Sequence, residues 1–113
     1  MLNNKTNILI KTEKEISYMR EAGNIIAEIM NKMEKAIEPG ITTFELDNIS
    51  KNEIKKNKVK SAFLGLYDFP NTICVSINEE IVHGIPSSRK LKNGDIISID
   101  AGVIVSGFFS DHA

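Results

Sequence analysis

Two aspartates near the end of the chain, Asp100 and Asp111, have the spacing of a metal-binding pair. Ser106 and Gly107 between them form a candidate two-residue hairpin turn. With that turn, Gly102 pairs with Asp111, and because side chains alternate along a strand, Asp111 lies diagonal to Asp100 on one face. Like charges at such a place repel each other, and a divalent cation, which prefers carboxylate oxygens, relieves the repulsion. The spacing therefore predicts a metal site on this face.

The hairpin alone leaves two other arrangements open. Both aspartates face water, or a loop of odd length places them on opposite faces of the sheet. Two carboxylates are also too few ligands for a tight site, so further ligands have to come from elsewhere. His112 is adjacent to Asp111 and therefore faces the opposite side of a strand, which makes it a poor third ligand.

A histidine and a cysteine are the other side chains with reactive chemistry. His83 lies in a His-Gly-Ile-Pro loop after a predicted strand, and its ordinary pKa of about 6.5 suits hydrogen bonding or proton transfer. The alternative is a loop histidine without a role. Cys74 lies in an apolar strand with no evident base, so we interpret it as a small buried residue rather than a nucleophile.

The composition is that of one small folded domain. The chain has 113 residues and a mass of 12.6 kDa, with 42% apolar and 26% charged residues, which excludes a disordered tail. A net charge of -1 argues against a dedicated nucleic-acid binder. We expect no membrane span, which needs about 18 apolar residues in a row, and no secretory signal in residues 1–12. The single cysteine excludes an internal disulfide and a cysteine-based zinc cluster, and it suits a reducing cytosol.

Two helices are predicted before the strands. The first covers residues 12–37, where Thr12 and Glu15 form a capping box. Its apolar stripe, methionines included, is interpreted as core and consists of Ile16, Met19, Gly23, Ile26, Met30, Met33 and Ile37. The second starts at Thr42, has Glu45 in the capping-box position and fades near Asn57. Its apolar side consists of Phe44, Leu46, Ile49 and Ile54.

Strands follow the helices, which predicts an α+β fold. Residues 66–71 are predicted as a loop, and residues 72–77 and 96–104 as strands, with a returning strand from Phe108. Residues 51–60 hold five lysines and one glutamate. We interpret them as the solvated end of a helix, with a docking patch for RNA as the alternative.

Several segments together resemble type I methionine aminopeptidases. Residues 76–86, which contain the run Asn-Glu-x-x-x-His-Gly-Ile-Pro, resemble the segment leading to the substrate-binding histidine of that family. Residues 92–100 and 107–111 are similar to the strands that carry its two metal-binding aspartates. Residues 10–23 and 39–43 are similar to its first helix and the next turn. The resemblance covers nearly the whole chain from about Ile10 and is far more specific than a lone motif.

The resemblance implies the N-terminal half of a pita-bread (creatinase/aminopeptidase-like) α+β fold, two helices followed by antiparallel strands. The family removes the initiator methionine from new proteins with two divalent metal ions, for which cobalt, manganese, iron and zinc are the candidates. By position, the resemblance implies that Asp100 is a bidentate ligand of one ion, that Asp111 bridges both, and that the catalytic His83 hydrogen-bonds the substrate or its tetrahedral intermediate. The matching positions around the methionine pocket are Phe63, Leu66, Phe69 and Cys74. Family members often have tyrosine in place of Leu66 and Phe69, so the pocket here is apolar without those hydroxyls.

The remaining metal ligands of the family, a histidine and two glutamates, match no residue of this chain. We therefore expect residues 1–113 to be a single domain that is the N-terminal part of a longer peptidase or a truncated gene product, with residues 1–9 a disordered extension. The isolated chain is expected to bind metal weakly and to hydrolyse nothing. Such a half-fold exposes a sheet edge and an apolar face, which favours pairing with another chain.

Two other functions stay open beside the aminopeptidase. One is a non-catalytic binding module of the same fold, and the other is a proline-specific peptidase. The presence of both aspartates favours an enzyme, and the His-Gly-Ile-Pro run favours the methionine branch. The expected partners are N-terminal methionine peptides of nascent proteins and, from the family's task, the ribosome, with no membrane and no specific nucleic acid. We expect a cytoplasmic protein that is monomeric at full length.

Overall fold

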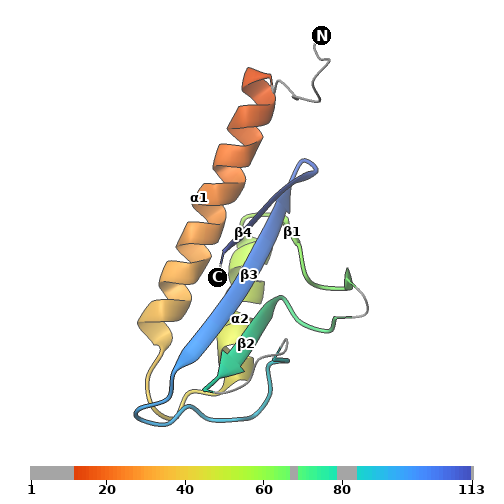
Figure 1. Cartoon of the computed structure of the whole chain (residues 1–113). Helices are drawn as coiled ribbons and strands as arrows, with labels where there is room; N and C mark the ends of the chain where they lie inside the picture. Colours follow the sequence, from red (N-terminus) through yellow and green to blue (C-terminus); the bar gives the residue numbers. More distant parts are fainter. Residues whose placement is uncertain (1–11, 67–68, 79–83, 113) are drawn as a thin grey trace, which may run out of the picture.

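Two helices precede a small antiparallel sheet (Figure 1). The computed structural model describes residues 12–66, 69–78 and 84–112, and for Asp111 and His112 it describes the backbone. The elements are α1 (Glu13–Ala36), α2 (Thr43–Lys56), β1 (Lys60–Ser61), β2 (Ile73–Ile77), β3 (Ile97–Val105) and β4 (Phe108–His112). This confirms the predicted order of helices before strands. The expected disordered extension at residues 1–9 lies outside the described residues.

Both helices begin at the predicted capping boxes. At the start of α1, the Thr12 hydroxyl accepts a hydrogen bond from the Glu15 backbone N–H at 3.1 Å, and the Glu15 carboxylate accepts one from the Thr12 N–H at 2.8 Å. Thr42 and Glu45 make the same two contacts at the start of α2, at 3.1 and 3.0 Å. Each box satisfies two donors that the first turn of a helix leaves without a partner.

The apolar stripe of α1 is buried over only part of its predicted length. The buried side chains are Ala22, Ile26, Ile29 and Met33. Ile16 and Met19 are 44% and 41% exposed, so the prediction that they belong to the core is wrong. The reason is visible in Figure 1, where the first turns of α1 extend past the tip of the β3–β4 hairpin. Tyr18 reaches this tip and stacks on Phe108, with the ring centroids 6.1 Å apart.

The buried face of the second helix, α2, also differs in part from the predicted one. Leu46 and Ile54 are buried as predicted, whereas Phe44 is 48% exposed. The buried face of α2 instead includes polar side chains, among them Asp47 and Ser50, which are fully buried. This face is therefore set by hydrogen bonding as well as by apolar packing.

The long strand β3 is the centre of the sheet, and every pairing in it is antiparallel. Ala101 pairs with Ile73 of β2 and also with His112 of β4, so β2 and β4 lie on opposite edges of β3. Ile104 pairs with Lys60 of β1 and also with Phe109 of β4, so β1 and β4 lie on opposite edges of β3. Strand β1 therefore lies on the same edge as β2. Two short strands thus share one edge of β3, and β4 takes the other.

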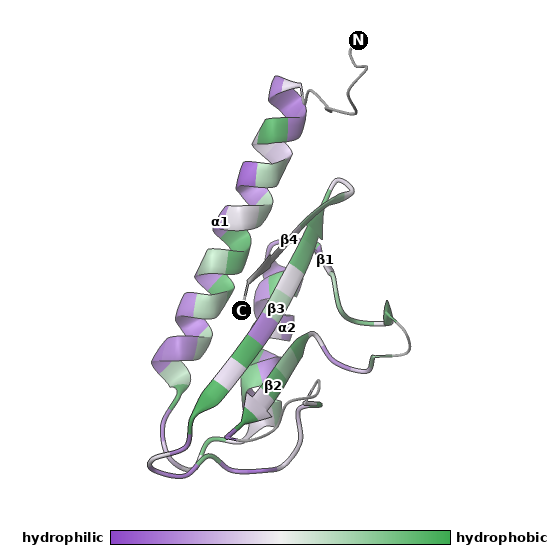
Figure 2. Ribbon diagram, viewed as in Figure 1, coloured by the Kyte–Doolittle hydropathy of each residue, from purple (hydrophilic) through white to green (hydrophobic). Residues whose placement is uncertain are grey.

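The helices cover one face of this sheet. Alternate residues of β3 are buried against them, namely Ile99, Ala101, Val103 and Val105. Ile73, Val75 and Ile77 of β2 are buried in the same layer. Figure 2 shows the corresponding alternation of hydrophobic with more polar residues along β3. Because side chains alternate, the even-numbered positions of β3 belong to the opposite, open face.

A buried carboxylate joins α2 to the segment that leads into β2. The Asp47 carboxylate accepts hydrogen bonds from the Asn71 side-chain amide at 2.9 Å, the Thr72 N–H at 2.9 Å and the Thr72 hydroxyl at 2.7 Å. Lys51 lies 3.1 Å from the same carboxylate. Burial alone raises the pKa of Asp47, but the hydrogen bonds from Asn71 and Thr72 outweigh it, so the pKa lies below its ordinary value. This charged, buried anchor fixes where β2 begins.

The lysine-rich residues 51–60 lie on the surface at the end of α2 and in β1. Lys51, Lys55, Lys56, Lys58 and Lys60 are all exposed. Lys55 and Lys56 occupy the last turn of α2, where positive charge complements the helix dipole. This agrees with a solvated helix end, and RNA docking stays an untested alternative. None of the described helices is long and apolar enough to cross a membrane.

The Asp47 anchor leads to a stability prediction. Asp47→Asn is expected to lower the free energy of unfolding at pH 7 by about 3 kcal/mol, because three buried donors lose a charged acceptor. Lys51→Ala is the matched control and should cost less than about 1 kcal/mol, since the Lys51 side chain is 45% exposed. Urea unfolding of the three proteins measures both effects.

The stability difference between wild type and Asp47→Asn is also predicted to depend on pH. A carboxyl group whose pKa is lowered on folding stabilises the protein above its ordinary pKa of about 4, and the effect disappears as the pH falls through the folded-state value. The stability difference between wild type and Asp47→Asn should therefore shrink on acidification below pH of about 4. An unchanged difference between neutral and strongly acidic solution would contradict this account of Asp47.

Candidate metal and substrate site

The β3–β4 hairpin has the register that the metal prediction requires. Val105 pairs with Phe108, and Gly102 pairs with Asp111. The turn residues Ser106 and Gly107 have φ values of +49° and +85°, the left-handed pair of a tight two-residue hairpin turn. The predicted turn and pairing are confirmed. The open alternative of an odd-length loop is excluded, because positions 100, 102 and 111 belong to the same face of the sheet.

Cys74 of β2 is directly opposite Asp100 on that face. The thiol is half-buried. Burial and, to a smaller extent, the negative charge of Asp100 raise the pKa of Cys74 above its ordinary value. A raised pKa keeps the residue a neutral thiol at physiological pH, which agrees with a small packing residue and not with a nucleophile.

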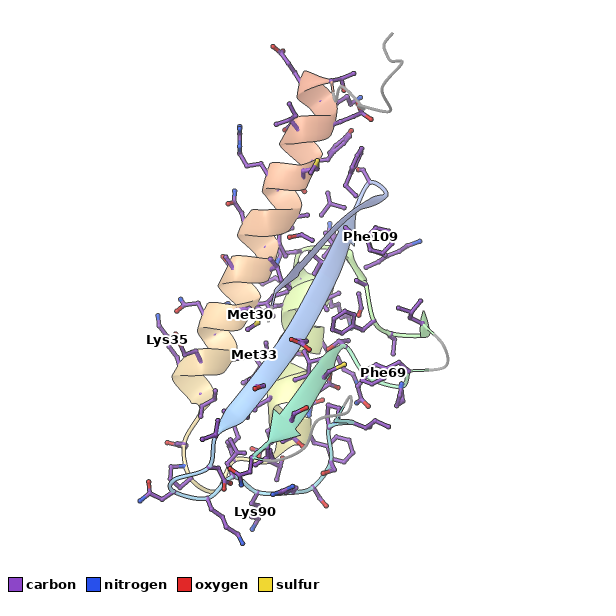
Figure 3. The ribbon with its side chains drawn as sticks, in the orientation of Figure 1. Met30, Met33, Lys35, Phe69, Lys90 and Phe109 are labelled. Atoms are coloured by element: carbon purple, nitrogen blue, oxygen red, sulfur yellow. The ribbon has the colours of Figure 1, made fainter. Side chains whose placement is uncertain are left out.

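Two of the expected pocket residues pack against each other beside the sheet. The rings of Phe63 and Phe69 meet edge to face, with centroids 6.5 Å apart and an interplanar angle of 89°. The segment that carries them is held to β3 by a hydrogen bond from the Ala62 N–H to the Gly102 carbonyl at 2.9 Å. Figure 3 shows Phe69 beside the end of the sheet formed by β2. Leu66 differs from this pair, since its side chain is 54% exposed.

His83 lies outside the described residues, but both flanks of its segment are fixed to the sheet. On one side, the Asn78 N–H donates to the Ile96 carbonyl at 2.7 Å, and the Asn78 amide donates to Asp95 at 3.1 Å. On the other side, the Val75 N–H donates to the Gly84 carbonyl at 2.9 Å. A side chain on Gly84 would overlap the Val75 carbonyl oxygen, so only glycine allows this close approach.

Sequence reasoning missed the role of Asn78 and Asp95. Hydrogen bonds from the Lys92 N–H and then from Asn78 hold the pKa of Asp95 below its ordinary value. Together these residues tie the end of β2 to the start of β3. The turn signal Lys-Asn-Gly-Asp at residues 92–95 was available in the sequence, but the long-range partner of Asp95 had no local signal.

The arrangement fits part of a divalent metal site. Carboxylate oxygens are the ligands that hard divalent cations prefer, and positions 100 and 111 are diagonal neighbours on the open face. The register puts position 112 on the opposite face, as predicted for His112. Among the side chains that the structure describes, which end at residue 110 and exclude His83 and Asp111, no group of three histidine, cysteine or acidic residues is close enough to hold an ion.

Comparisons with a family model and with known proteins both match metallopeptidases. The model of metallopeptidase family M24 matches residues 17–113. The methionine aminopeptidase of Clostridium perfringens is 48% identical over 106 residues, which cover 94% of this chain and 43% of the relative. The chain thus spans less than half the length of this relative. The resemblance inferred from the sequence motifs is confirmed.

Solved structures with the same fold include enzymes of more than one specificity. The crystal structure of methionine aminopeptidase from Rickettsia prowazekii matches with a TM-score of 0.86 and 40% identity, over 92% of this chain and 42% of that one. The Xaa-Pro dipeptidase from Bacillus anthracis matches with a TM-score of 0.71 and 25% identity, over 91% of this chain and 28% of that one. These matches confirm the predicted α+β fold class.

The tight contact at Gly84 can be tested by substitution. Gly84→Ala is expected to lower the free energy of unfolding by about 2 kcal/mol or more, because the new methyl group overlaps the Val75 carbonyl. Gly23→Ala is the control, since Gly23 lies in α1 with open space around it and should gain up to about 1 kcal/mol in helix propensity. Equal effects of the two substitutions in urea unfolding would be incompatible with this packing.

Proposed function

Because the chain belongs to metallopeptidase family M24, we propose that it carries the aspartate ligands of an aminopeptidase that removes the N-terminal methionine of new proteins. The observation that supports this most directly is the β3–β4 register, which puts positions 100 and 111 on one face. The 48% identity to a protein named methionine aminopeptidase supports the substrate class.

In this proposal, Asp100 and Asp111 hold two divalent ions through their carboxylate oxygens, and Asp111 is shared between the ions. When bound, such ions supply Lewis acidity and a water that ionises near neutral pH. Two carboxylates are too few ligands for a tight site, so the proposal requires further ligands in addition to these two side chains. Cobalt, manganese, iron and zinc remain the candidate metals.

The remaining predicted residues act on the substrate. His83 holds the substrate through a hydrogen bond, a role suited to an imidazole, which can donate from one ring nitrogen and accept at the other. Phe63, Leu66, Phe69 and Cys74 form the wall of the methionine pocket. The edge-to-face pair of Phe63 and Phe69 offers an apolar surface to a thioether side chain, which gains about 1.5–3 kcal/mol from full burial.

A proline-specific peptidase is the second candidate, since the fold is shared. The identity to the Xaa-Pro dipeptidase is 25%, compared with 40% and 48% to the two methionine aminopeptidases. This difference favours the methionine specificity. The substrate class in turn favours a cytoplasmic enzyme that works near the ribosome, as a monomer in its complete form.

Metal titration tests the ligand assignment. We expect Mn²⁺ and Co²⁺ to bind the chain weakly and Asp100→Asn or Asp111→Asn to weaken binding at least about tenfold, a loss of about 1.4 kcal/mol. Glu21→Gln, which removes an exposed carboxylate of α1, is the matched control and should bind as wild type does. Isothermal titration calorimetry measures all four proteins. Equal affinities for wild type and both aspartate variants would refute the assignment.

Activity can be tested in a chimera. The chain is joined to the part of the Clostridium perfringens enzyme that lies outside the 106 aligned residues. We expect this chimera to release methionine from a Met-Ala-Ser peptide and not to cleave an Ala-Pro-Ser peptide, and Asp100→Asn to reduce the rate at least about a hundredfold. The isolated 113-residue chain should release nothing. Preference for the proline peptide would instead support the second candidate.

A further inference from the structure

The exposed face of α2 carries an aromatic ring and two lysines in one line. Phe44, Asn48, Lys51 and Lys55 follow one another at helical spacing, which puts them on the same face of the helix. All four residues are exposed. We call them the α2 stripe. No carboxylate belongs to it, so the stripe has an apolar end at the start of the helix and a positive end near its last turn.

The apolar end of the α2 stripe is fixed in place. Phe44 is exposed, and its backbone N–H donates to the Ser87 carbonyl at 2.9 Å. The hydroxyl of the neighbouring Thr43 donates to the same carbonyl at 3.1 Å and accepts from the Ser87 N–H at 2.7 Å. A large apolar side chain is therefore presented to solvent from a rigid support, which lowers the entropy cost of binding a partner.

The positive end of the α2 stripe continues into Lys58. Lys51 lies 3.1 Å from the buried Asp47 carboxylate, so part of its charge is balanced. Lys55 and Lys58 form no ion pair with any residue that the structure describes. The Lys58 N–H donates to the Lys55 carbonyl at 3.1 Å, which puts the two lysines side by side where the helix ends. The charge of these two lysines is thus available to a partner.

Lys58 has a backbone conformation that favours glycine. Its φ is +57°, and it follows the C-cap residue Asn57. The Val59 N–H donates to the Ile54 carbonyl at 3.2 Å, and this bond and the one from Lys58 to Lys55 form a Schellman motif. The left-handed position of that motif is usually glycine, because a side chain there is strained. Stability alone therefore favours glycine, whereas the lysine contributes a positive charge.

We propose that the α2 stripe and Lys58 dock an acidic segment of another protein, in which carboxylates follow an apolar residue. An α-helix rises about 1.5 Å per residue, so Lys51 and Lys55 lie about 10 and 16 Å beyond Phe44 along the axis. An extended segment advances about 3.3 Å per residue. Carboxylates three and five places after the apolar residue therefore face these two lysines, and the next alternate position reaches Lys58. The inference does not depend on metal binding or peptidase activity.

A protein partner is favoured over RNA, the alternative raised for residues 51–60. A nucleic-acid strand is attracted by the electric field of the whole molecule, and the net charge of this chain is -1. The neighbouring helix α1 carries five glutamates against three lysines and one arginine, which disfavours a long polyanion beside α2. A short acidic segment contacts the α2 stripe alone. Its apolar residue also gains a contact with Phe44, in addition to the charge pairing.

Fluorescence anisotropy tests the proposal with a defined probe. The probe is the blocked, dye-labelled octapeptide Phe-Ser-Ser-Glu-Ser-Glu-Ser-Glu, titrated with the full chain at low salt. We expect it to bind at least about tenfold more tightly than the same peptide with glutamine in place of glutamate, and at least about threefold more tightly than with serine in place of phenylalanine. Equal binding of the glutamine peptide, or tighter binding of an eight-nucleotide oligouridylate, would overturn the proposal.

A charge reversal in the chain locates the binding. Lys55→Glu should weaken binding of the probe at least about tenfold, because the reversed charge repels its carboxylates. Lys35→Glu is the matched control, since it makes the same change at an exposed position of α1. Figure 3 shows Lys35 on the side of α1 that points away from the sheet. Lys35→Glu should change the affinity less than about twofold, and equal effects of the two reversals would overturn the proposal.

Lys58→Gly separates a docking role from a structural one. Glycine adopts positive φ without strain, so this variant should unfold at a higher urea concentration than wild type. At the same time it should bind the probe about threefold more weakly, because one positive charge is lost. A gain in stability together with unchanged affinity would overturn the inclusion of Lys58 in the site.

Discussion

The register between β3 and β4 is the constraint on which the candidate site depends. Ser106 and Gly107 both adopt positive φ, which closes the hairpin after two residues and makes Gly102 the partner of Asp111. A shift by one residue would move position 111 to the helix-covered face. An unpaired carboxylate there would lie among buried apolar side chains at a cost of several kcal/mol. The two-residue turn sets this register, and the burial of alternate β3 residues stabilises it against a one-residue shift.

The other parts of the site depend on β3 through a few polar contacts. Asp47 fixes the entry of β2, and β2 puts Cys74 opposite Asp100. The close approach of Gly84 to Val75 and the bonds of Asn78 to the start of β3 hold both flanks of the segment that contains His83. The hydrogen bond from Ala62 to Gly102 ties the segment with Phe63 to the same strand. Residues distant in sequence thus converge on one strand.

Local signals in the sequence predicted both helices and the strands β2, β3 and β4, but they did not predict the short strand β1. Capping boxes at Thr12 and Thr42 and the turn at Ser106 depend on residues within one turn of each other, so their chemistry is visible in the sequence. The class of fold and the shared face of Asp100 and Asp111 followed from these signals. Residue periodicity was less reliable where an element extends past its neighbours, as at Met19.

Long-range polar contacts were not predictable in this way. Asp47 is separated from its partner Thr72 by 25 residues, and nothing near either residue indicates the pairing. The helical spacing of Thr43, Asp47, Ser50 and Ile54 does mark one face of α2, but its burial depends on donors from a distant segment. The exposure of Phe44 follows from the same cause, since the polar face and not the aromatic residue packs inward.

The central claim is that one ion is shared by Asp100 and Asp111. Paramagnetic broadening of the carboxyl ¹³C signals by Mn²⁺ measures this most directly, because it reports each side chain separately. We predict that both signals broaden with one midpoint and that Asp111→Asn abolishes the broadening at Asp100. Different midpoints for the two carboxylates, or unchanged broadening of Asp100 in Asp111→Asn, would contradict a shared ion.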